Sequence, residues 1–381
     1  MESKVRDIPD PVGIADATTL PAHWYADNDH HHLEMQAIFG QGWVGAGVID
    51  DLPLPGAWTA RSVAGTPVLL VVDRTGELRA FLNVCRHRAA PLCEPGDHTA
   101  GPMIRCPYHS WLYRLDGTLA RAGGVGHPSE FDLSDYSLFP VGVHVWRRTI
   151  WINLGAVDAP FDLGPLANAI DSFPLEAFEL IASETDDRLF NWKVLLENYS
   201  ENYHTPFVHP EIDTSSTEDY PMVSAGAVLY AWDRPLRPSA DDPSGVIRAT
   251  LLPGEPGWDL LATANPTRPY GVGSYLTIWP NMMVNVFPDA LLVMWMQPLG
   301  PTTTRVERRL YVAAAVSGDQ RDAIAASHRQ VHMQDIDICQ RVQRSHTAGV
   351  NANGRLATVE ERGVYFVHAQ LRAALDHAGR F

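Results

Sequence analysis

Two runs organise this chain: Cys85-Arg86-His87 and, after eighteen intervening residues, Cys106-Pro107-Tyr108-His109. Together they offer two thiolates and two imidazoles to a metal site. Tetrahedral zinc accepts that ligand set, and so does a [2Fe–2S] cluster in which two Cys bind one iron and two His bind the other. The spacing therefore predicts a metal centre within residues 85–109 and, by itself, leaves both kinds of centre open.

The residues around the second pair narrow the choice. Pro107 lies inside the pair, and Ser110-Trp111 follow it. This pattern resembles the Rieske loops of ring-hydroxylating and related non-haem iron oxygenases. The resemblance implies a Rieske [2Fe–2S] cluster, whose histidines raise its reduction potential above that of an all-Cys ferredoxin. The implied ligands are Cys85, His87, Cys106 and His109.

Composition limits the classes of function. The 381 residues carry a formal charge of −16, with 45% hydrophobic and 19% charged residues, which is typical of a globular protein with a large core. The acidic balance argues against nucleic-acid binding, which needs a basic surface. No apolar run reaches the roughly 18–20 residues of a membrane span. The N-terminus has no apolar signal core, so we expect a cytoplasmic protein without a membrane partner.

The predicted secondary structure changes twice along the chain. Residues 1–40 hold a polar lead-in and a helix over about Ala22–Phe39, and we expect this segment to pack with the C-terminal domain. Residues 41–155 consist of short apolar runs and turns, including the hairpin signal Asp116-Gly117, and predict an all-β domain with both Cys–His pairs on hairpin loops. Residues 156–381 form a second, larger domain.

The run His30-His31-His32 suggests a further metal site at first sight. Consecutive side chains on a helix point about 100° apart, so the three rings cannot face one ion. We therefore expect these histidines to lie on a solvated face.

The C-terminal domain mixes helices and strands. Asn191–His204 has no Gly or Pro and predicts one helix, which we expect to end at Thr205-Pro206 because proline disfavours helical geometry in the residue before it. Residues 211–270 are rich in Pro, Asp, Ser and Gly and predict long loops. An antiparallel sheet is predicted over the runs 275–278, 282–287, 290–298 and 306–316, and two helices are predicted over 320–345 and 364–378.

A second metal site is predicted at the end of the predicted helix Asn191–His204. His204 and His209 are five residues apart, which on a regular helix would separate them by about 140°, but a helix that ends at Pro206 lets His209 turn back. Two His and one carboxylate form the ligand set of mononuclear non-haem Fe(II) oxygenases. The predicted helix 320–345 offers Asp335 and Asp337 as the carboxylate.

Helical geometry favours Asp335 over Asp337. Ile324, Ile338 and Cys339 lie within roughly 60° of Asp335, whereas Asp337 shares its face with the polar residues Gln330, Gln334, Arg341 and Arg344. An acid on an apolar face must be paired or metal-bound, because burying a lone charge is costly. We therefore expect Asp335 to be the iron ligand, with Asp337 as the alternative.

The motif from Asn191-Trp192-Lys193 to His209-Pro210 resembles the catalytic helix of Rieske non-haem iron oxygenase α subunits. The resemblance runs from about residue 20 to the end. It implies an α+β fold, with an all-β Rieske [2Fe-2S] domain inserted in a helix-flanked antiparallel-sheet (helix-grip-like) catalytic domain that holds mononuclear Fe(II). It further implies O2 as co-substrate, a homotrimer (or α3β3 assembly), and NAD(P)H electrons that arrive through a separate flavin- or ferredoxin-type reductase.

Family members carry an acid three residues before the first iron histidine, and here that position is Glu201. The resemblance implies that Glu201 bridges the two metal sites, and Asn198 is a weaker candidate for a role beside it. The spacing from Asn198 to His204 resembles the branch of carnitine, glycine-betaine and choline monooxygenases. Asn202 and Thr205 depart from that branch, in which Cys is common at both positions.

Aromatic side chains suit a quaternary ammonium substrate through cation–π contacts. Candidates are Tyr203, Phe207, Tyr270, Trp279 and Trp295. We expect monooxygenation, that is N-demethylation or hydroxylation, of a small quaternary or tertiary amine such as a betaine, carnitine or choline-like compound. The alternatives are a Rieske hydroxylase, dioxygenase or O-demethylase that acts on an aromatic substrate, and, more remotely, a non-enzymatic Rieske or zinc electron-transfer or structural module.

Overall fold

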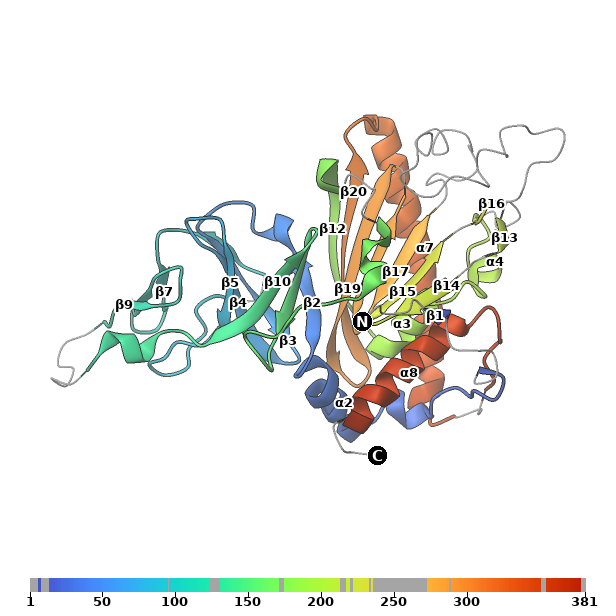
Figure 1. The fold of residues 1–381 in the computed structure, drawn as a ribbon, viewed down its shortest axis with the longest axis horizontal. Coiled ribbons are helices and arrows are strands. Elements are labelled where there is room, and N and C mark those ends of the chain that lie inside the picture. Colours follow the sequence, from blue (N-terminus) through green and yellow to red (C-terminus); the bar gives the residue numbers. More distant parts are fainter. Residues whose placement is uncertain are drawn as a thin grey trace. The chain divides into compact units, whose positions relative to one another are not determined.

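A computed structural model describes residues 6–7, 14–94, 96–123, 131–170, 175–212, 217–219, 222–232, 234–235, 273–287, 289–350 and 354–377 (Figure 1). The chain divides into two compact units. One unit is Met35–Phe161, and the other combines Met1–Glu34 with Asp162–Phe381. These limits lie a few residues from the predicted ones at 40 and 155. In the described part of the chain, no helix is long and apolar enough to cross a membrane.

The unit Met35–Phe161 is built from antiparallel strands. Its larger sheet has the order β2-β11-β10-β5-β4-β3-β6, and β7-β8-β9 form a smaller one. The strands are β2 (Trp43–Val48), β3 (Ala57–Val63), β4 (Thr66–Val72), β5 (Leu78–Leu82), β6 (His98–Ala100), β7 (Ile104–Arg105), β8 (Leu112–Tyr113), β9 (Leu119–Arg121), β10 (Pro140–Trp146) and β11 (Thr149–Asn153). Short helical turns are η2 (Met35–Phe39), η3 (Ile49–Asp51) and η4 (Leu133–Tyr136).

The turn signal Asp116-Gly117 connects β8 to β9, as predicted. Gly117 has a φ of +83°, and a Cβ there would lie 2.4 Å from the ring of Phe81. Only glycine satisfies both the left-handed backbone and this close approach. The turn thereby packs the small sheet against β5 of the large one.

The second unit holds an eight-stranded antiparallel sheet of order β1-β14-β15-β17-β18-β19-β20-β12. Its strands are β1 (Arg6–Asp7), β12 (Phe178–Arg188), β14 (Met222–Ala225), β15 (Val228–Trp232), β17 (Ser274–Ile278), β18 (Met282–Val286), β19 (Ala290–Gly300) and β20 (Thr303–Ala313), and β13 (Thr217–Asp219) pairs with β16 (Arg234–Pro235). The helices are η1 (Ala22–Tyr25), α2 (Asn28–Glu34), η5 (Pro165–Ile170), η6 (Leu175–Ala177), α3 (Trp192–Tyr199), α4 (Thr205–Val208), α7 (Gly318–Thr347) and α8 (Arg362–His377).

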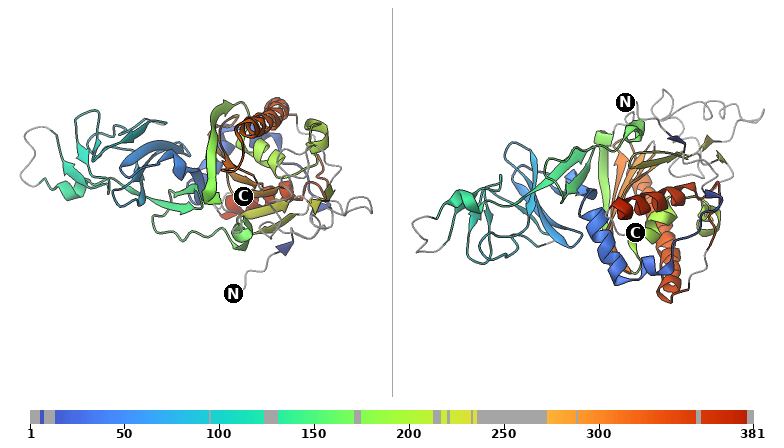
Figure 2. Two further views of the ribbon diagram at one scale, coloured as in Figure 1. Left: turned by 90° about the horizontal axis from the view of Figure 1, so that it is seen from above. Right: turned by 60° about the horizontal axis from the view of Figure 1, so that its bottom comes forward.

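Three helices pack together beside this sheet. The helix α3 contacts both α7 and α8 (Figures 1 and 2). Ile324 of α7 packs with Leu292 of β19 and Leu310 of β20, which places α7 on the sheet face that carries these leucines. Gly363 of α8 lies so close to α3 that a Cβ there would be 1.8 Å from the carbonyl oxygen of Ser200. This glycine therefore sets how closely α8 approaches the end of α3.

Two predictions about the N-terminal segment were wrong. The expected helix over Ala22–Phe39 is instead the succession η1, α2 and η2. His30 and His31 are buried rather than solvated, at 8% and 9% exposed. His30 stacks on Trp24 at 4.4 Å between ring centroids, and its Nε2 lies 3.1 Å from Glu34 Oε1. Burial follows from these two partners, which a helical projection of the histidines alone does not show.

Strands in the C-terminal domain are distributed more widely than predicted. The sheet over residues 274–313 and the helices α7 and α8 lie where the sequence indicated. Within the expected loop region 211–270, however, β14 and β15 add two strands to the sheet, because each pairs along its length with a neighbouring strand. Residues 236–270 of that expected loop lie outside the described residues.

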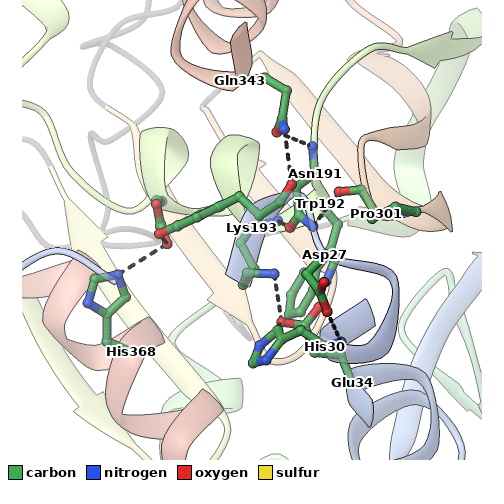
Figure 3. A network of polar contacts seen from close by, with 11 residues as sticks. Asp27, His30, Glu34, Asn191, Trp192, Lys193, Pro301, Gln343 and His368 are labelled. Carbon is green, nitrogen blue, oxygen red and sulfur yellow. Dashed lines mark hydrogen bonds and ion pairs between the residues drawn. The ribbon is translucent and has the colours of Figure 1, made fainter. Parts of the chain in front are cut away.

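A buried polar network ties the N-terminal segment to α3 (Figure 3). Glu34 Oε1 accepts from Lys193 Nζ at 2.6 Å, and Glu34 Oε2 accepts from Trp192 Nε1 at 2.9 Å. Both members of the ion pair are 0% exposed. Burial lowers the pKa of Lys193, whereas Lys193 outweighs burial at Glu34 and holds the pKa of that carboxyl below its usual value.

The same network continues along α3 to α7 and α8. Tyr25 Oη donates to Glu197 Oε1 at 2.7 Å, and His368 Nε2 lies 3.1 Å from that oxygen. The side chain of Gln343 accepts from the backbone of Asn191 at 2.8 Å and donates to the carbonyl of Tyr25 at 3.0 Å. The helix α3 is therefore held by side chains of the N-terminal segment, α7 and α8.

Breaking the ion pair from one side should be costly. We expect Lys193→Met to lower the free energy of unfolding of this unit by about 3–5 kcal/mol, because Glu34 would remain charged in a buried site. The double variant Lys193→Met/Glu34→Gln leaves no buried charge and keeps an acceptor for Trp192, so it should be more stable than Lys193→Met alone. Denaturant titrations of wild type, both single variants and the double variant measure the coupling. Strictly additive losses would contradict this account.

Candidate metal centres

The two histidines of the predicted iron site flank one helical turn. The predicted helix Asn191–His204 was too long, because α3 ends at Tyr199. Ser200 Oγ donates back to the carbonyl of Leu196 at 2.6 Å and so competes with the backbone ladder. A new turn, α4, then runs over Thr205–Val208 with His204 as its N-cap and His209 as its C-cap.

Proline acts differently from its predicted role in this turn. Pro206 occupies the first turn of α4 rather than ending a helix, because a missing N–H is tolerated at that position. The amide of His209 donates to the carbonyl of Thr205 at 3.0 Å, and that of Val208 to His204 at 2.9 Å. One closed helical turn therefore lies between the two imidazoles and lets them face the same point.

His204, His209 and Asp335 converge. Asp335 Oδ1 lies 3.0 Å from His209 Nε2 and 3.4 Å from His204 Nε2. The three ligand atoms lie within 4.8 Å of one another and could hold a metal ion. Asp337 lies elsewhere, since it is 59% exposed and pairs with Arg341 at 2.5 Å.

Each histidine is also held at its other ring nitrogen. His204 Nδ1 is 2.5 Å from Glu201 Oε1, and His209 Nδ1 is 2.7 Å from Gln334 Oε1. A hydrogen-bond acceptor at the second nitrogen is the usual support of a metal-binding imidazole. Gln334 was predicted to lie on the polar face of its helix, but the turn at α4 brings His209 over that face. Gln334 directly precedes the ligand Asp335 in the sequence, and this adjacency is the signal that could have identified it.

Oppositely charged side chains face one another in this site. Burial lowers the pKa of His204, but the hydrogen bonds with Asp335 and Glu201 outweigh it and raise that pKa to about 9. Burial raises the pKa of Asp335, but the two histidines outweigh it and hold that pKa below its usual value. These three side chains thus form a pocket of opposite charges in which a cation can replace the protons of the imidazoles.

The Cys–His region forms two loops with the same backbone pattern. The amide of Cys85 donates to the carbonyl of Ala90 at 2.8 Å, and that of Cys106 donates to Trp111 at 2.8 Å. Ala89 and Ser110, each four residues after a cysteine, both have a φ of +58°. Non-glycine residues rarely adopt that conformation, and such strain concentrates at functional sites.

Only one of these loops connects a hairpin. The loop 106–111 joins the paired strands β7 and β8, as predicted. The loop after Cys85 leads from β5 to β6, which pairs with β3 instead, so the first Cys–His pair does not lie on a hairpin. The two cysteines are each 1% exposed.

The arrangement of these four side chains fits a two-iron cluster better than zinc. His87 Nδ1 and His109 Nδ1 lie 3.1 Å apart on the outer side of the buried thiols. Ligands of one tetrahedral zinc would be separated by about 3.3–3.8 Å throughout. Among the described residues, three ligand atoms come within 4.8 Å of one another only at His204, His209 and Asp335. The thiols and imidazoles therefore form two separate pairs, as a [2Fe–2S] centre requires.

Tyr113 is a contact that the sequence analysis missed. Its oxygen accepts from the amide of Arg86 at 3.0 Å and lies 3.3 Å from Cys85 Sγ. Burial raises the pKa of Tyr113, so its hydroxyl keeps a proton to donate to that sulfur. Its position two residues after Trp111 could have suggested this role.

The aromatic residues predicted to bind substrate lie in different surroundings. Tyr203 and Phe207, 53% and 78% exposed, flank His204 with ring centroids 6.4 Å apart. Trp279 packs 5.8 Å from Trp192, next to the Lys193–Glu34 pair. Tyr270 is outside the described residues.

Trp295 lies on the face of β19 opposite to the face that packs against α7. It is 0% exposed and lies under the guanidinium of Arg309, 5.0 Å from its ring centroid. Side chains alternate along a strand, so Trp295 and Leu292 of β19 lie on opposite faces. Leu292 contacts α7, which carries Asp335, so Trp295 is on the sheet face away from that helix.

Glu201 is fastened within its own loop. Its carboxylate accepts from the amides of Tyr203 and His204 as well as from the imidazole of His204. The predicted contact between Glu201 and His204 is therefore present, but a tight turn rather than a helix produces it. Asn198 lies on α3 and is half-buried, and its role stays a prediction.

Comparisons with known proteins agree with both centres. Residues 175–377 match the family of the ring hydroxylating alpha subunit (catalytic domain), and residues 42–130 match the Rieske [2Fe-2S] domain. The chain is 26% identical over 390 residues to choline monooxygenase, chloroplastic, of Spinacia oleracea, which covers 98% of this chain and 82% of that protein. It is 28% identical over 359 residues to the glycine betaine monooxygenase oxygenase subunit of Pseudomonas aeruginosa, with 88% and 83% covered.

A solved structure shares the fold along nearly the whole chain. It is a quaternary ammonium Rieske monooxygenase whose report concerns carnitine oxidation by gut microbiota and inter-subunit electron transfer. The TM-score is 0.75 at 22% identity, with 97% of this chain and 99% of that one covered. The fold, the two matched families and the convergent ligand atoms lead to one conclusion: this chain belongs to the ring-hydroxylating alpha-subunit family and is a Rieske oxidoreductase with a [2Fe-2S] cluster and a mononuclear iron.

Proposed function

We propose that this chain is the oxygenase component of a Rieske monooxygenase that oxidises a small quaternary or tertiary amine, by N-demethylation or hydroxylation. The observation that carries the oxygenase part is the convergence of His204, His209 and Asp335, two imidazoles and one carboxylate around a single point. This ligand set leaves coordination positions open for O2 chemistry. The names of the similar proteins support the amine as substrate.

Cys85, His87, Cys106 and His109 would hold the cluster, and the three convergent residues would hold the iron. When bound, the cluster supplies single electrons and the iron activates O2. The chain itself orients both groups: Tyr113 would donate to the cluster-bound thiolate of Cys85, and Glu201 and Gln334 fix the imidazoles of His204 and His209. The similar proteins described as oxygenase subunits support a separate reductase for this chain, which would pass on electrons from NAD(P)H.

Charge around the iron site supports a cationic substrate. Burial raises the pKa of Glu361, and the negative charges of the nearby Glu201 and Glu197 raise it further. With Asp335, these carboxylates give the site a negative potential that attracts cations. The exposed rings of Tyr203 and Phe207 beside His204 offer faces for cation–π contacts with an alkylammonium group.

We also infer a homotrimer in which Glu201 connects the cluster of one subunit with the iron of its neighbour. Glu201 already accepts from His204, and a second imidazole such as His109 of a neighbouring subunit would complete the bridge. A similar structure, described as revealing inter-subunit electron transfer, supports this assembly.

The amine proposal is tested with a panel of substrates. With a generic reductase, we expect trimethylammonium compounds to give O2 consumption matched by product formation and, for N-demethylation, by formaldehyde. Neutral aromatic compounds should give little product, because they cannot use the negative potential of the site. Mass spectrometry of the products, together with NADH and O2 uptake, decides the question. Hydroxylation of aromatics alone would refute the amine substrate and leave the oxygenase assignment intact.

The choice of carboxylate ligand is tested with two variants of α7. Asp335→Ala should lose the mononuclear iron and lower turnover by more than about 100-fold, because changes even in outer partners of a metal cost 10–100-fold. Asp337→Ala, the matched control, should keep both iron and turnover. Iron analysis and the visible Rieske spectrum, which both variants should retain, are the measurements. The reverse pattern would assign the ligand to Asp337.

Glu201→Gln tests the bridge between the centres. The amide can still accept from the local N–H groups, so both metals should stay bound, but the loss of charge should slow electron transfer from cluster to iron by at least about 10-fold. Rapid-mixing absorbance of the reduced cluster after O2 addition measures that rate. Mixed trimers of this variant with Asp335→Ala should not regain activity, because every iron site then lacks either Glu201 or Asp335. Cluster oxidation at the wild-type rate would remove Glu201 from the pathway.

A further inference from the structure

The amide of Gln334 connects a buried histidine of the iron site to a surface acid. His209 Nδ1 lies 2.7 Å from Gln334 Oε1, and Gln334 Nε2 donates to Glu211 Oε2 at 3.1 Å. His209 is 2% exposed, whereas Glu211 is exposed. The three side chains therefore form a short chain of hydrogen bonds that runs from the iron site to the surface.

The chemistry of the outer member sets the direction of this chain. A carboxylate only accepts hydrogen bonds, so Glu211 must face the NH2 group of Gln334. The amide oxygen then faces His209, and because that oxygen also only accepts, Nδ1 must carry the proton. In a neutral imidazole with its proton on Nδ1, the lone pair is on Nε2, the nitrogen that lies 3.0 Å from Asp335.

We propose that Gln334 and Glu211 are positioning residues that select the Nδ1–H tautomer of His209 and so leave Nε2 free to bind the iron. This inference rests on the ligand set proposed above and adds two residues to it. Glu211 touches neither the metal site nor His209 in this account. It acts only by fixing which end of the Gln334 amide faces inward.

His204 and His209 have different partners at the second ring nitrogen, and this difference explains why His209 needs the hydrogen-bond relay formed by Gln334 and Glu211. His204 is backed by Glu201, a carboxylate that accepts at either oxygen and cannot be reversed. Gln334 is an amide, and a half-turn of its end group would exchange acceptor for donor. With NH2 facing inward, Nδ1 would have to accept, the proton would move to Nε2, and the ring could not bind a metal through that atom.

Metal affinity is the direct measure of this role. The mononuclear iron is removed by chelation from the full-length protein with its Rieske cluster in place, and Co(II) binding is followed by calorimetry. We expect Gln334→Leu to weaken Co(II) binding by about 10–100-fold, as for other outer partners of metal ligands. Gln330→Leu, which changes an exposed glutamine one turn earlier on α7, should bind Co(II) like wild type.

Variants of Glu211 test the direction of the amide. In Glu211→Gln the neighbour can accept or donate, so about half of the molecules keep the binding tautomer and affinity should fall only about twofold. In Glu211→Lys the neighbour can only donate, so the amide oxygen turns outward and affinity should fall about as far as in Gln334→Leu. The loss should persist in 1 M salt, where the screening length is about 3 Å and the added surface charge has little effect.

A rescue separates orientation from general damage. In Glu211→Lys/Gln334→Glu, the new carboxylate accepts from His209 in either orientation and pairs with the lysine. Co(II) affinity should then return to within about threefold of wild type at the same salt concentration, with an unchanged Rieske spectrum.

The outcomes distinguish this inference from the proposal on which it rests. If Asp335→Ala binds Co(II) as tightly as wild type, the ligand set itself is wrong. If Asp335→Ala loses binding while Gln334→Leu stays within twofold of wild type, the ligand set stands and the relay is wrong. Wild-type affinity of Glu211→Lys in high salt, or no recovery in the double variant, would likewise overturn the relay.

Discussion

Two imidazoles five residues apart must present the same ring nitrogen to one carboxylate, and much of the catalytic unit serves that constraint. A continuous helix would separate the rings, so α3 stops at Tyr199 and the single turn α4 carries His204 and His209 on its two ends. The acid comes from α7, a helix of 30 residues that also packs on the sheet. The close approach of α8 at Gly363 supports the backbone where α3 ends.

Precise placement of these ligands needs a rigid start to α3, and buried charge provides it. Lys193 and Glu34 are both fully buried, which is costly unless each charge is paired and hydrogen-bonded. Trp192 and His30 supply the additional contacts on the carboxylate. An N-terminal segment that is distant in sequence thereby becomes part of the catalytic unit, and it constrains a helix whose far end leads to the iron site.

The β-rich unit solves a related problem in another way. Its two metal loops share one backbone pattern, including a left-handed residue at Ala89 and Ser110, although one loop lies on a hairpin and the other does not. The thiols of Cys85 and Cys106 are buried and His87 is exposed, so the histidine side of a bound cluster would face the surface. This asymmetry suits the entry and exit of electrons, since transfer rates depend on close approach to the surface.

The sequence by itself determined the identity of the reactive groups and the kind of fold, because Cys, His and Asp at these spacings have few alternative uses and strand and helix periods are local. It also favoured Asp335, since an acid on the apolar face of a helix needs a partner. Only the tertiary structure decided the rest. Where α3 ends, the burial of His30, the face of Trp295 and the place of Gln334 all depend on contacts between residues far apart in the chain. A helical projection treats each element alone, and so it cannot show that the turn at α4 carries His209 over a polar face.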